Sequence, residues 1–273
     1  MTIQSPEGIA FLARDALRNI VLLKYLERYP EHARVHFVSD AQGGAALVLL
    51  DTRVDPYNRR AYPMAAWTAV ISSDHPDLTR SLLERLPRRV GIVFKLATDE
   101  DRAVVEAEFP LTRATCFLSF SGSLPSTPDE DVLVTSAPSA AVFRLFETQN
   151  HERQWLEPLL DSGRALVSIV PREGRPLAIC FAFENYGSVW EVGGVITLPE
   201  FRGKGLAARS VRVAIGELAR RGLAPRYQVE EGNVASIRLA TKIGLKPFLS
   251  LTHYLHAPAP VAEPCLRSNK TDT

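Results

Sequence analysis

Cysteine is scarce in this chain, and its three cysteines, Cys116, Cys180 and Cys265, lie far apart. So small and odd a number forms neither a disulfide framework nor a zinc-binding pattern. Free thiols of this kind are typical of a reducing compartment, so we expect a cytoplasmic protein. The pair His253 and His256 offers no metal site either, because positions three apart on a strand point to opposite faces. We therefore expect no metal.

Long apolar runs and an excess of either charge are absent as well. No segment reaches the roughly 18 apolar residues of a membrane span, and charges interrupt the N-terminal apolar stretch, unlike in a secretory signal peptide. The 32 basic and 31 acidic residues leave a net charge of +1. This balance provides no electrostatic attraction to nucleic acid or to an anionic membrane. We expect neither as a partner.

The composition that remains, 46% hydrophobic and 23% charged, is that of a globular protein with room for two domains. Small, polar and proline-containing residues over 121–131 predict a linker. We accordingly expect an N-terminal α/β domain over 1–125, a second domain over 126–258 and a disordered tail over 259–273.

Apolar periodicity predicts alternating strands and helices. In the first half we expect helices over 6–28, 77–86 and 99–109, and strands over 34–39, 45–51, 65–72, 90–96 and 111–120. In the second half we expect a hairpin of strands over 165–171 and 176–184, further strands over 188–197, 227–229 and 248–256, and helices over 203–221 and 234–243. The fold class is therefore α/β, with a mixed, mostly antiparallel sheet flanked by helices in each domain.

The segment 191–208 carries the clearest chemical signal. A strand ends near Thr197, and Arg202-Gly-Lys-Gly-Leu-Ala207 opens a long helix. Its glycines let the backbone turn tightly and leave the amides uncovered, while the helix dipole and the basic side chains favour an anion. The pattern predicts a site for a pyrophosphate.

Two other interpretations of this segment stay open. Gly203-x-Gly205-x-x-Ala208 formally fits a dinucleotide fingerprint, although the strands before it are expected to form a hairpin rather than a βαβ unit. The segment is also compatible with a glycine-rich helix start that binds nothing. A P-loop is excluded, because no Ser or Thr follows Lys204.

The segment Arg202-Gly-Lys-Gly-Leu-Ala207 resembles the [QR]-x-x-G-x-[GA] signature with which GNAT acetyltransferases bind the pyrophosphate of acetyl-CoA. Further along, Asn233-Val-Ala-Ser236 and Lys242-Ile-Gly-Leu245 resemble the second CoA-binding element of that family. The resemblance implies a GNAT fold in the second domain, with acetyl-CoA or another acyl-CoA as co-substrate. It implies that the CoA is held by Val195, Ile196, Thr197, Arg202, Gly203, Lys204, Gly205, Leu206, Ala207, Asn233 and Ser236.

Over 191–202 the chain is also similar to the glycine N-acyltransferase family, whose members place a GNAT domain after an N-terminal domain of similar size. One interpretation of the N-terminal half follows from its strand–helix alternation without a pyrophosphate loop. It is a degenerate copy of the GNAT fold, which walls the acceptor site or mediates a homodimer.

Attack of an uncharged amine on a thioester needs a base for the amine proton and donors for the oxyanion. The resemblance puts the base at Glu191, with Glu184 as the fallback. The alternative for Glu191 is a solvated strand glutamate. Backbone N–H groups of 193–196 are the expected oxyanion donors, because glycines within a strand indicate a bulge or a close ligand approach. The alternative there is a glycine pair packed under a bulky neighbour.

Many relatives protonate the departing thiolate with a tyrosine, where this chain has Ala240. Either Tyr227 or Tyr254 replaces it, or no acid is needed, because a thiol with a pKa near 8.5 is already a fair leaving group. We therefore predict transfer of an acetyl or other acyl group to a primary amine of a small molecule or peptide. The rival hypothesis, motivated by the missing tyrosine, is a non-catalytic CoA-binding or scaffold protein.

Overall fold

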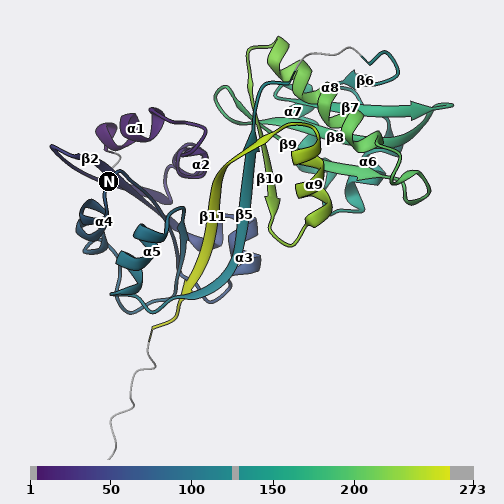
Figure 1. Cartoon of the computed structure of the whole chain (residues 1–273). Coiled ribbons are helices and arrows are strands. Elements are labelled where there is room, and N and C mark those ends of the chain that lie inside the picture. Colours follow the sequence, from purple (N-terminus) through teal and green to yellow (C-terminus); the bar gives the residue numbers. More distant parts are fainter. Residues whose placement is uncertain (1–4, 125–128, 259–273) are drawn as a thin grey trace, which may run out of the picture.

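The computed structural model describes residues 5–124 and 129–258 (Figure 1). The predicted boundary between residues 125 and 126 and the predicted tail over 259–273 lie outside the described residues. The strands are β1 (Ala33–Asp40), β2 (Gly43–Asp51), β3 (Trp67–Ser73), β4 (Ile92–Leu96), β5 (Thr112–Ser121), β6 (Leu133–Thr135), β7 (Ala165–Arg172), β8 (Arg175–Tyr186), β9 (Val189–Thr197), β10 (Ala224–Glu230) and β11 (Lys246–His256). The α-helices are α1 (Pro6–Ala13), α2 (Ile20–Arg28), α3 (Pro56–Ala61), α4 (Pro76–Leu83), α5 (Asp99–Glu106), α6 (Ala140–Glu147), α7 (Arg153–Asp161), α8 (Leu206–Arg220) and α9 (Val234–Lys242).

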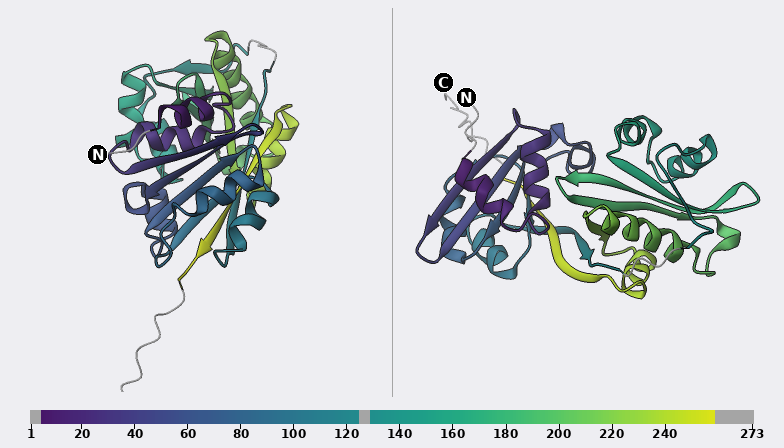
Figure 2. Two further views of the ribbon diagram at one scale, coloured as in Figure 1. Left: turned by 90° about the vertical axis from the view of Figure 1, so that its left-hand side faces the viewer. Right: turned by 90° about the horizontal axis from the view of Figure 1, so that it is seen from above.

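The strands form one sheet in the order β1-β2-β3-β4-β11-β5-β10-β9-β8-β7-β6. Two of its neighbouring pairs, β3–β4 and β9–β10, are parallel, and the others are antiparallel. Helices cover both faces of the sheet (Figure 2). The predicted α/β class, with a mixed and mostly antiparallel sheet, is confirmed.

The two halves follow the same succession of elements. Each half forms a hairpin, β1–β2 or β7–β8, and adds a third strand. It then crosses through a helix, α4 or α8, to a fourth strand parallel to the third, and a second helix and a last strand follow. The N-terminal half therefore repeats the topology of the C-terminal half, as the copy interpretation predicts.

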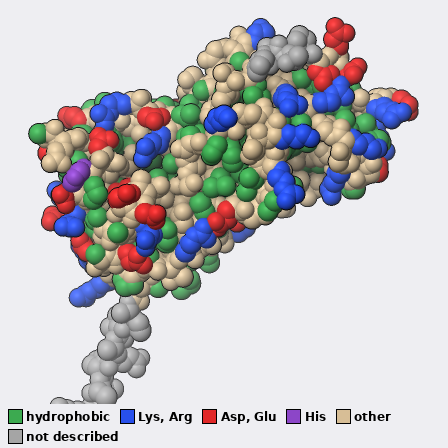
Figure 3. All heavy atoms as spheres, in the orientation of Figure 1, with side chains coloured by type: hydrophobic (Ala, Val, Ile, Leu, Met, Phe, Trp, Pro, Cys, Tyr) green, Lys and Arg blue, Asp and Glu red, His purple; other side chains and the backbone are tan. Residues whose placement is uncertain are grey.

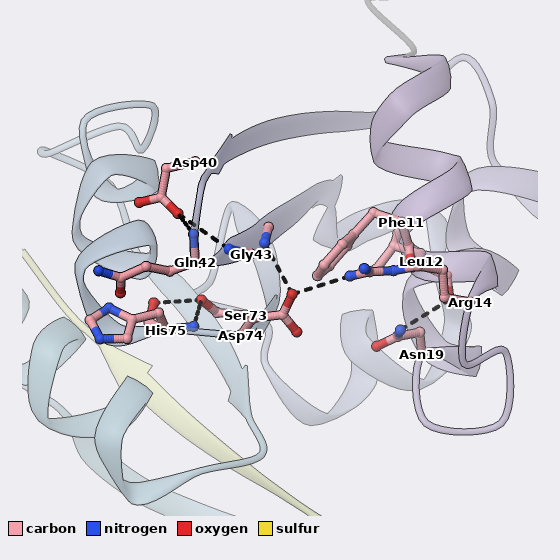
Figure 4. A network of polar contacts seen from close by, with 11 residues as sticks. Phe11, Leu12, Arg14, Asn19, Asp40, Gln42, Gly43, Ser73, Asp74 and His75 are labelled. Atoms are coloured by element: carbon pink, nitrogen blue, oxygen red, sulfur yellow. Dashed lines mark hydrogen bonds and ion pairs between the residues drawn. The ribbon is translucent and has the colours of Figure 1, made fainter.

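The N-terminal half differs at the helix start that corresponds to the glycine loop. The side chain of His75 caps α4 by accepting from the N–H of Asp77. Asp74 accepts from the N–H of Gly44 at 3.0 Å and from Arg14 at 3.1 Å (Figure 4). A carboxylate beside a capped helix start repels an anion. This end of the copy is therefore unsuited to a pyrophosphate.

The two halves exchange their last strands. β11, the last strand of the C-terminal half, pairs with β4 of the N-terminal half, and β5, the last strand of the N-terminal half, pairs with β10. The two exchanged strands also pair with each other over most of their length. The halves are therefore joined by backbone hydrogen bonds through the middle of one sheet (Figure 1).

Each half buries one apolar cluster on either face of its part of the sheet. In the N-terminal half, α4 and α5 cover one cluster and α1 and α2 the other. In the C-terminal half, α8 and α9 cover the first cluster and α6 and α7 the second. Helix α2 also contacts β8, so the N-terminal half reaches over the sheet of the C-terminal half.

The prediction of one helix over 6–28 is wrong. The chain turns at 14–19 between α1 and α2, and the buried Asn19 donates a hydrogen bond back to the carbonyl of Leu12 at 3.0 Å. Apolar residues on both helices face the same cluster, so their periodicity continues across the corner and hides it. The other predicted strands and helices match observed elements, with ends that shift by a few residues.

A buried lysine lies in the sheet of the N-terminal half. Lys95 of β4 is 4% exposed, and its ammonium donates to the hydroxyl of Tyr25 at 2.8 Å and to Oδ1 of Asn58 at 2.9 Å. Burial lowers the pKa of Lys95 to about 7, since desolvation disfavours the charged form.

Stability should therefore increase with pH above neutrality. Between pH 7 and 10.5 the unfolded chain holds a proton on Lys95 that the folded chain lacks, so the free energy of unfolding rises across this window, by about 1.4 kcal/mol per pH unit at most. Urea unfolding of the wild type at pH 7 and 9 should show this rise. Lys95→Met should reduce this rise to the part that comes from Lys24, whose pKa burial also lowers, whereas Lys246→Met, at an exposed lysine, should keep it whole. Equal slopes in all three proteins would contradict the assignment.

Candidate active site

Strand β9 bulges at its two glycines. Its register with β8 shifts between the pairs Ile179–Ile196 and Phe181–Gly193. Gly194 has a φ of 59°, and a Cβ atom there would lie well inside contact distance of the Phe181 ring. The bulge and the glycine pair packed under a bulky neighbour, which were alternatives from the sequence, therefore occur together.

Beyond this point β9 and β10 separate. Their parallel pairing ends at Val192 and Tyr227, while from Tyr227 to Glu230 strand β10 pairs with β5 on its other edge. The edge of β9 over 193–197 consequently has no ladder with β10. Backbone groups at such a splay are available to a ligand.

The loop after β9 leads to an uncapped helix start. Gly203 and Gly205 have φ values of 77° and 79°, in the left-handed region that favours glycine, and no atom lies near the position of a Cβ on either. Gly205 is the N-cap of α8 and supplies no capping side chain. The first N–H groups of a helix lack intrahelical partners and carry the positive end of its dipole. Arg202 joins this loop to β9 by donating from Nε to the carbonyl of Thr197 at 3.2 Å.

The bulge, the splay and the helix start line one cleft of about 670 Å³. Of the residues predicted to hold CoA, the cleft is lined by Val195, Thr197, Arg202, Gly203, Gly205, Leu206, Ala207, Asn233 and Ser236. Arg238 and Lys242 of α9 add positive charge, and no Asp or Glu lies among its lining residues. Basic side chains also gather on the face of the C-terminal half that carries α8 and α9 (Figure 3).

Residues 135–245 match the acetyltransferase (GNAT) family. This segment of the chain belongs to the GNAT family. Its members are in general acyl-CoA-dependent N-acyltransferases. No curated protein matches the chain.

Solved structures with the same fold cover nearly the whole chain. An acetyltransferase of the GNAT family from Colwellia psychrerythraea is 14% identical over 94% of this chain and 98% of its own, with a TM-score of 0.57. A GCN5-related N-acetyltransferase from Kribbella flavida is 16% identical over 88% and 95%, with a TM-score of 0.54. A tandem GNAT protein from the clavulanic acid biosynthesis pathway is 12% identical over 96% and 98%, with a TM-score of 0.52. These likenesses concern the fold alone. Because they cover nearly the whole chain, the shared fold includes the N-terminal half.

Two residues predicted to hold CoA do not line the cleft of the GNAT domain. Ile196 is buried in the apolar cluster under α6 and α7. The ammonium of Lys204 lies 4.9 Å from the ring centroid of Phe201, and Lys204 lines a neighbouring cleft. Along β9, side chains alternate between the two faces, so Val195 and Ile196 cannot both face the same site.

Glu191, the predicted base, lies on β9 but is not among the residues that line the cleft. Its Oε2 accepts from Arg226 at 2.6 Å and from Asn185 at 3.0 Å, and its Oε1 accepts from the N–H of Gln228 at 3.1 Å. Three of the roughly four acceptor positions of the carboxylate are thus occupied. The side chain of Arg226 is only 2% exposed, so this ion pair is buried.

Glu184, the fallback, is also engaged elsewhere. Its carboxylate accepts from Arg164 at 2.6 Å, and it lines a separate cleft between α2 and α7 with Lys24 and Trp155. Neither glutamate therefore presents a free carboxylate to the cleft at the bulge.

Of the two tyrosines considered as the proton donor in place of the residue at position 240, only one lies at the cleft. Tyr227 lines the cleft, and its hydroxyl lies 2.5 Å from Oγ of Ser236. Tyr254 packs against the cluster of α4 and α5 in the N-terminal half. Ala240 itself is completely buried. Burial raises the pKa of Tyr227, so this hydroxyl stays protonated at neutral pH.

Several lining residues were missed by sequence reasoning, among them Arg238 of α9 and two residues outside the GNAT motifs. Gln149 and His151 lie in the connection between α6 and α7 and reach the cleft beside the bulge. The turn contains Asn150, which has a left-handed φ of 60°. Asn adopts this conformation more readily than most residues, so this single Asn is the only signal of the turn in the sequence. Among residues 5–124 and 129–258, no group of three potential metal ligands occurs, and no helix is long and apolar enough to span a membrane.

Gly194→Ala should destabilise the protein by about 2–5 kcal/mol, because the methyl group meets Phe181 and the left-handed backbone is strained. Gly187→Ala is the matched control: Gly187 has a φ of 51° with open space around it, so the backbone cost alone remains, about 1–2 kcal/mol. Urea unfolding of the two variants measures the difference. An equal loss in both would contradict the contact between Gly194 and Phe181.

Proposed function

We propose that this chain transfers an acetyl or other acyl group from acyl-CoA to a primary amine of a small molecule or peptide. The observation that carries the proposal is the uncapped start of α8, which opens into the same cleft as the bulge of β9. An anion-binding end and a place for a carbonyl oxygen then lie in one continuous site, as CoA and its thioester require.

The residues at the helix start suit the pyrophosphate of CoA. Free N–H groups and the helix dipole attract phosphate oxygens, and glycines leave the approach open. Arg202 from the loop, with Arg238 and Lys242 from α9, supplies further positive charge without opposing carboxylates. A dinucleotide also carries a pyrophosphate, and β9, α8 and the parallel β10 form a βαβ unit. The dinucleotide fingerprint follows its strand directly, however, whereas residues 198–202 separate β9 from the glycines here.

In the proposed reaction the amine nitrogen attacks the thioester carbonyl carbon. The carbonyl oxygen becomes negative, and backbone N–H groups at the bulge and splay of β9 are the donors that we propose stabilise it. The C–S bond then breaks, and CoA leaves as the thiolate. The products are the amide and CoA, while the amine proton passes to a base.

The role of Tyr227 follows from its pKa. A free thiol has a pKa near 8.5, and burial raises the pKa of Tyr227 above its ordinary value of 10. Full proton transfer from Tyr227 to the thiolate is therefore uphill. We propose instead that Tyr227 stabilises the thiolate by a hydrogen bond, and that no dedicated acid is needed.

The rival function is non-catalytic binding of CoA. The engagement of Glu191 and Glu184 in ion pairs outside the cleft favours it. Thiol release from acetyl-CoA with a panel of primary amines separates the two functions. Binding of CoA without turnover of any amine would favour the rival.

Arg202→Glu should weaken CoA binding at least about tenfold, roughly 1.4 kcal/mol, since it replaces an attractive charge in the cleft with a repulsive one. Isothermal titration with CoA measures the effect. Arg59→Glu makes the same charge change at an exposed position of α3 in the N-terminal half and should alter the affinity little. Unchanged affinity in a folded Arg202→Glu protein would refute the proposed pyrophosphate site.

Tyr227→Phe should lower kcat about tenfold and leave CoA affinity nearly unchanged. The loss corresponds to the low end of the roughly 1.5–3 kcal/mol that a hydrogen bond to a charged group contributes. Initial rates of thiol release with a saturating amine provide the measurement, and Tyr254→Phe is the control outside the cleft. A Tyr227→Phe rate equal to that of the wild type would remove Tyr227 from the reaction.

A further inference from the structure

We propose that His151 accepts the amine proton during acyl transfer, and that the cleft selects a primary amine without a second positive charge. This inference rests on the function proposed above and concerns the same cleft. It assigns the base to a residue outside the two glutamates.

The turn between α6 and α7 holds His151 at the cleft. Asn150, in the left-handed conformation, reverses the chain, and the N–H of His151 donates to the carbonyl of Phe146 at 3.1 Å. The imidazole lies edge-on to the ring of Phe181, with centroids 5.0 Å apart and an interplanar angle of 88°. Trp155 adds a second aromatic neighbour at 6.4 Å. The histidine is thus held by backbone and ring contacts.

Phe181 also links His151 to the reacting end of the cleft. The same ring lies against Gly193 and Gly194, the residues of the bulge. His151 and both glycines line the cleft that starts at α8. A thioester carbonyl at the bulge therefore has an imidazole beside it, whereas the carboxylates of Glu191 and Glu184 are bound to arginines outside this cleft.

The imidazole is chemically available. Within the described part of the chain, neither ring nitrogen of His151 has a hydrogen-bond partner. Burial alone lowers the pKa of His151 below 6.5, and no charged group contributes to the shift. The other titratable groups of the cleft are Tyr227, Arg202, Arg238 and Lys242. At neutral pH the ring is therefore uncharged and able to accept a proton.

The proposed reaction needs only the amine, the acyl-CoA and solvent. As the C–N bond forms, the amine N–H proton moves to a free ring nitrogen of His151, and the electron pair of the carbonyl moves to oxygen. That pair returns as the C–S bond breaks and thiolate leaves. The imidazolium then releases its proton to solvent, and the free thiolate takes up one from solvent.

The charges of the cleft restrict the amine. Its three cationic side chains are assigned to the phosphates of CoA, and no carboxylate lines it, so no side chain there pairs with an additional ammonium group. A polyamine would bring unpaired positive charge into the cleft, which is unfavourable. The acceptor class is therefore a primary amine with no other cationic group.

The test uses the full chain, acetyl-CoA and a panel of amines: glycine, β-alanine, ethanolamine and tyramine as single amines, and spermidine as the polycation. Wild type should release thiol with a single amine at a kcat/KM well above that for spermidine. His151→Asn should lower this kcat/KM by about 10²- to 10⁴-fold, the range of a lost general base. His36→Asn, at a half-buried histidine on β1, should stay within about twofold of wild type.

The pH profile distinguishes a base from a positioning residue. For wild type, log kcat/KM should rise with a slope of about two below the pKa of His151, where ring and amine must both lose a proton, and of about one above it. In His151→Asn the slope should be about one throughout, because only the amine still titrates. Added imidazole should restore part of the activity of His151→Ala. CoA affinity, measured by titration calorimetry, should be unchanged in each variant.

The outcomes that would contradict the proposed function differ from those that would contradict the role of His151. Absence of turnover with every amine in a wild-type protein that binds CoA would overturn the proposed function and the inference with it. Wild-type turnover with an equally active His151→Asn would overturn the inference alone. A two-step slope that persists in His151→Asn but disappears in Glu191→Gln would assign the proton to Glu191. Faster turnover of spermidine than of the single amines would refute the charge selection.

Discussion

Strand β10 lies between β9 and β5, and the cleft opens where its pairing with β9 ends, at Tyr227. Up to Tyr227 it pairs with β9, and from Tyr227 onward it pairs with β5. Because β5 belongs to the N-terminal half, the exchange of last strands gives β10 a partner on its other edge over the residues that no longer pair with β9. The opening that results contains the free edge of β9, its bulge and the start of α8.

A buried ion pair lies where the strands diverge. Arg226 and Glu191 are directly paired residues of β10 and β9, and Arg226 also donates to Oγ of Ser119 on β5 at 3.0 Å. One guanidinium thus connects the three strands that meet at the splay. Removing one partner of a buried pair is costly because the remaining charge is left unpaired. These contacts suit Glu191 to holding the strands in place.

The N-terminal half repeats the topology of the C-terminal half and lacks its open helix start. Where α8 has an open glycine start, α4 has a capping histidine and an aspartate that bonds the β1–β2 hairpin and Arg14 (Figure 4). Its contribution to the C-terminal half is mechanical: β5 completes the sheet, and α2 contacts β8.

The amino-acid sequence by itself determined the local features of this protein. Gly203 and Gly205 specify a left-handed turn, Asn233 caps α9 through the N–H of Ser236, and the residues around 172–175 close a hairpin, because each depends on neighbours in the chain. Only the tertiary structure decided the strand exchange, the engagement of Glu191 and the place of His151. Those depend on residues such as Phe120, Arg226 and Phe181, which are distant in the chain from their partners. Local patterns carry no signal for such contacts, since many pairings of apolar strands bury similar surface and only the complete sheet selects one of them.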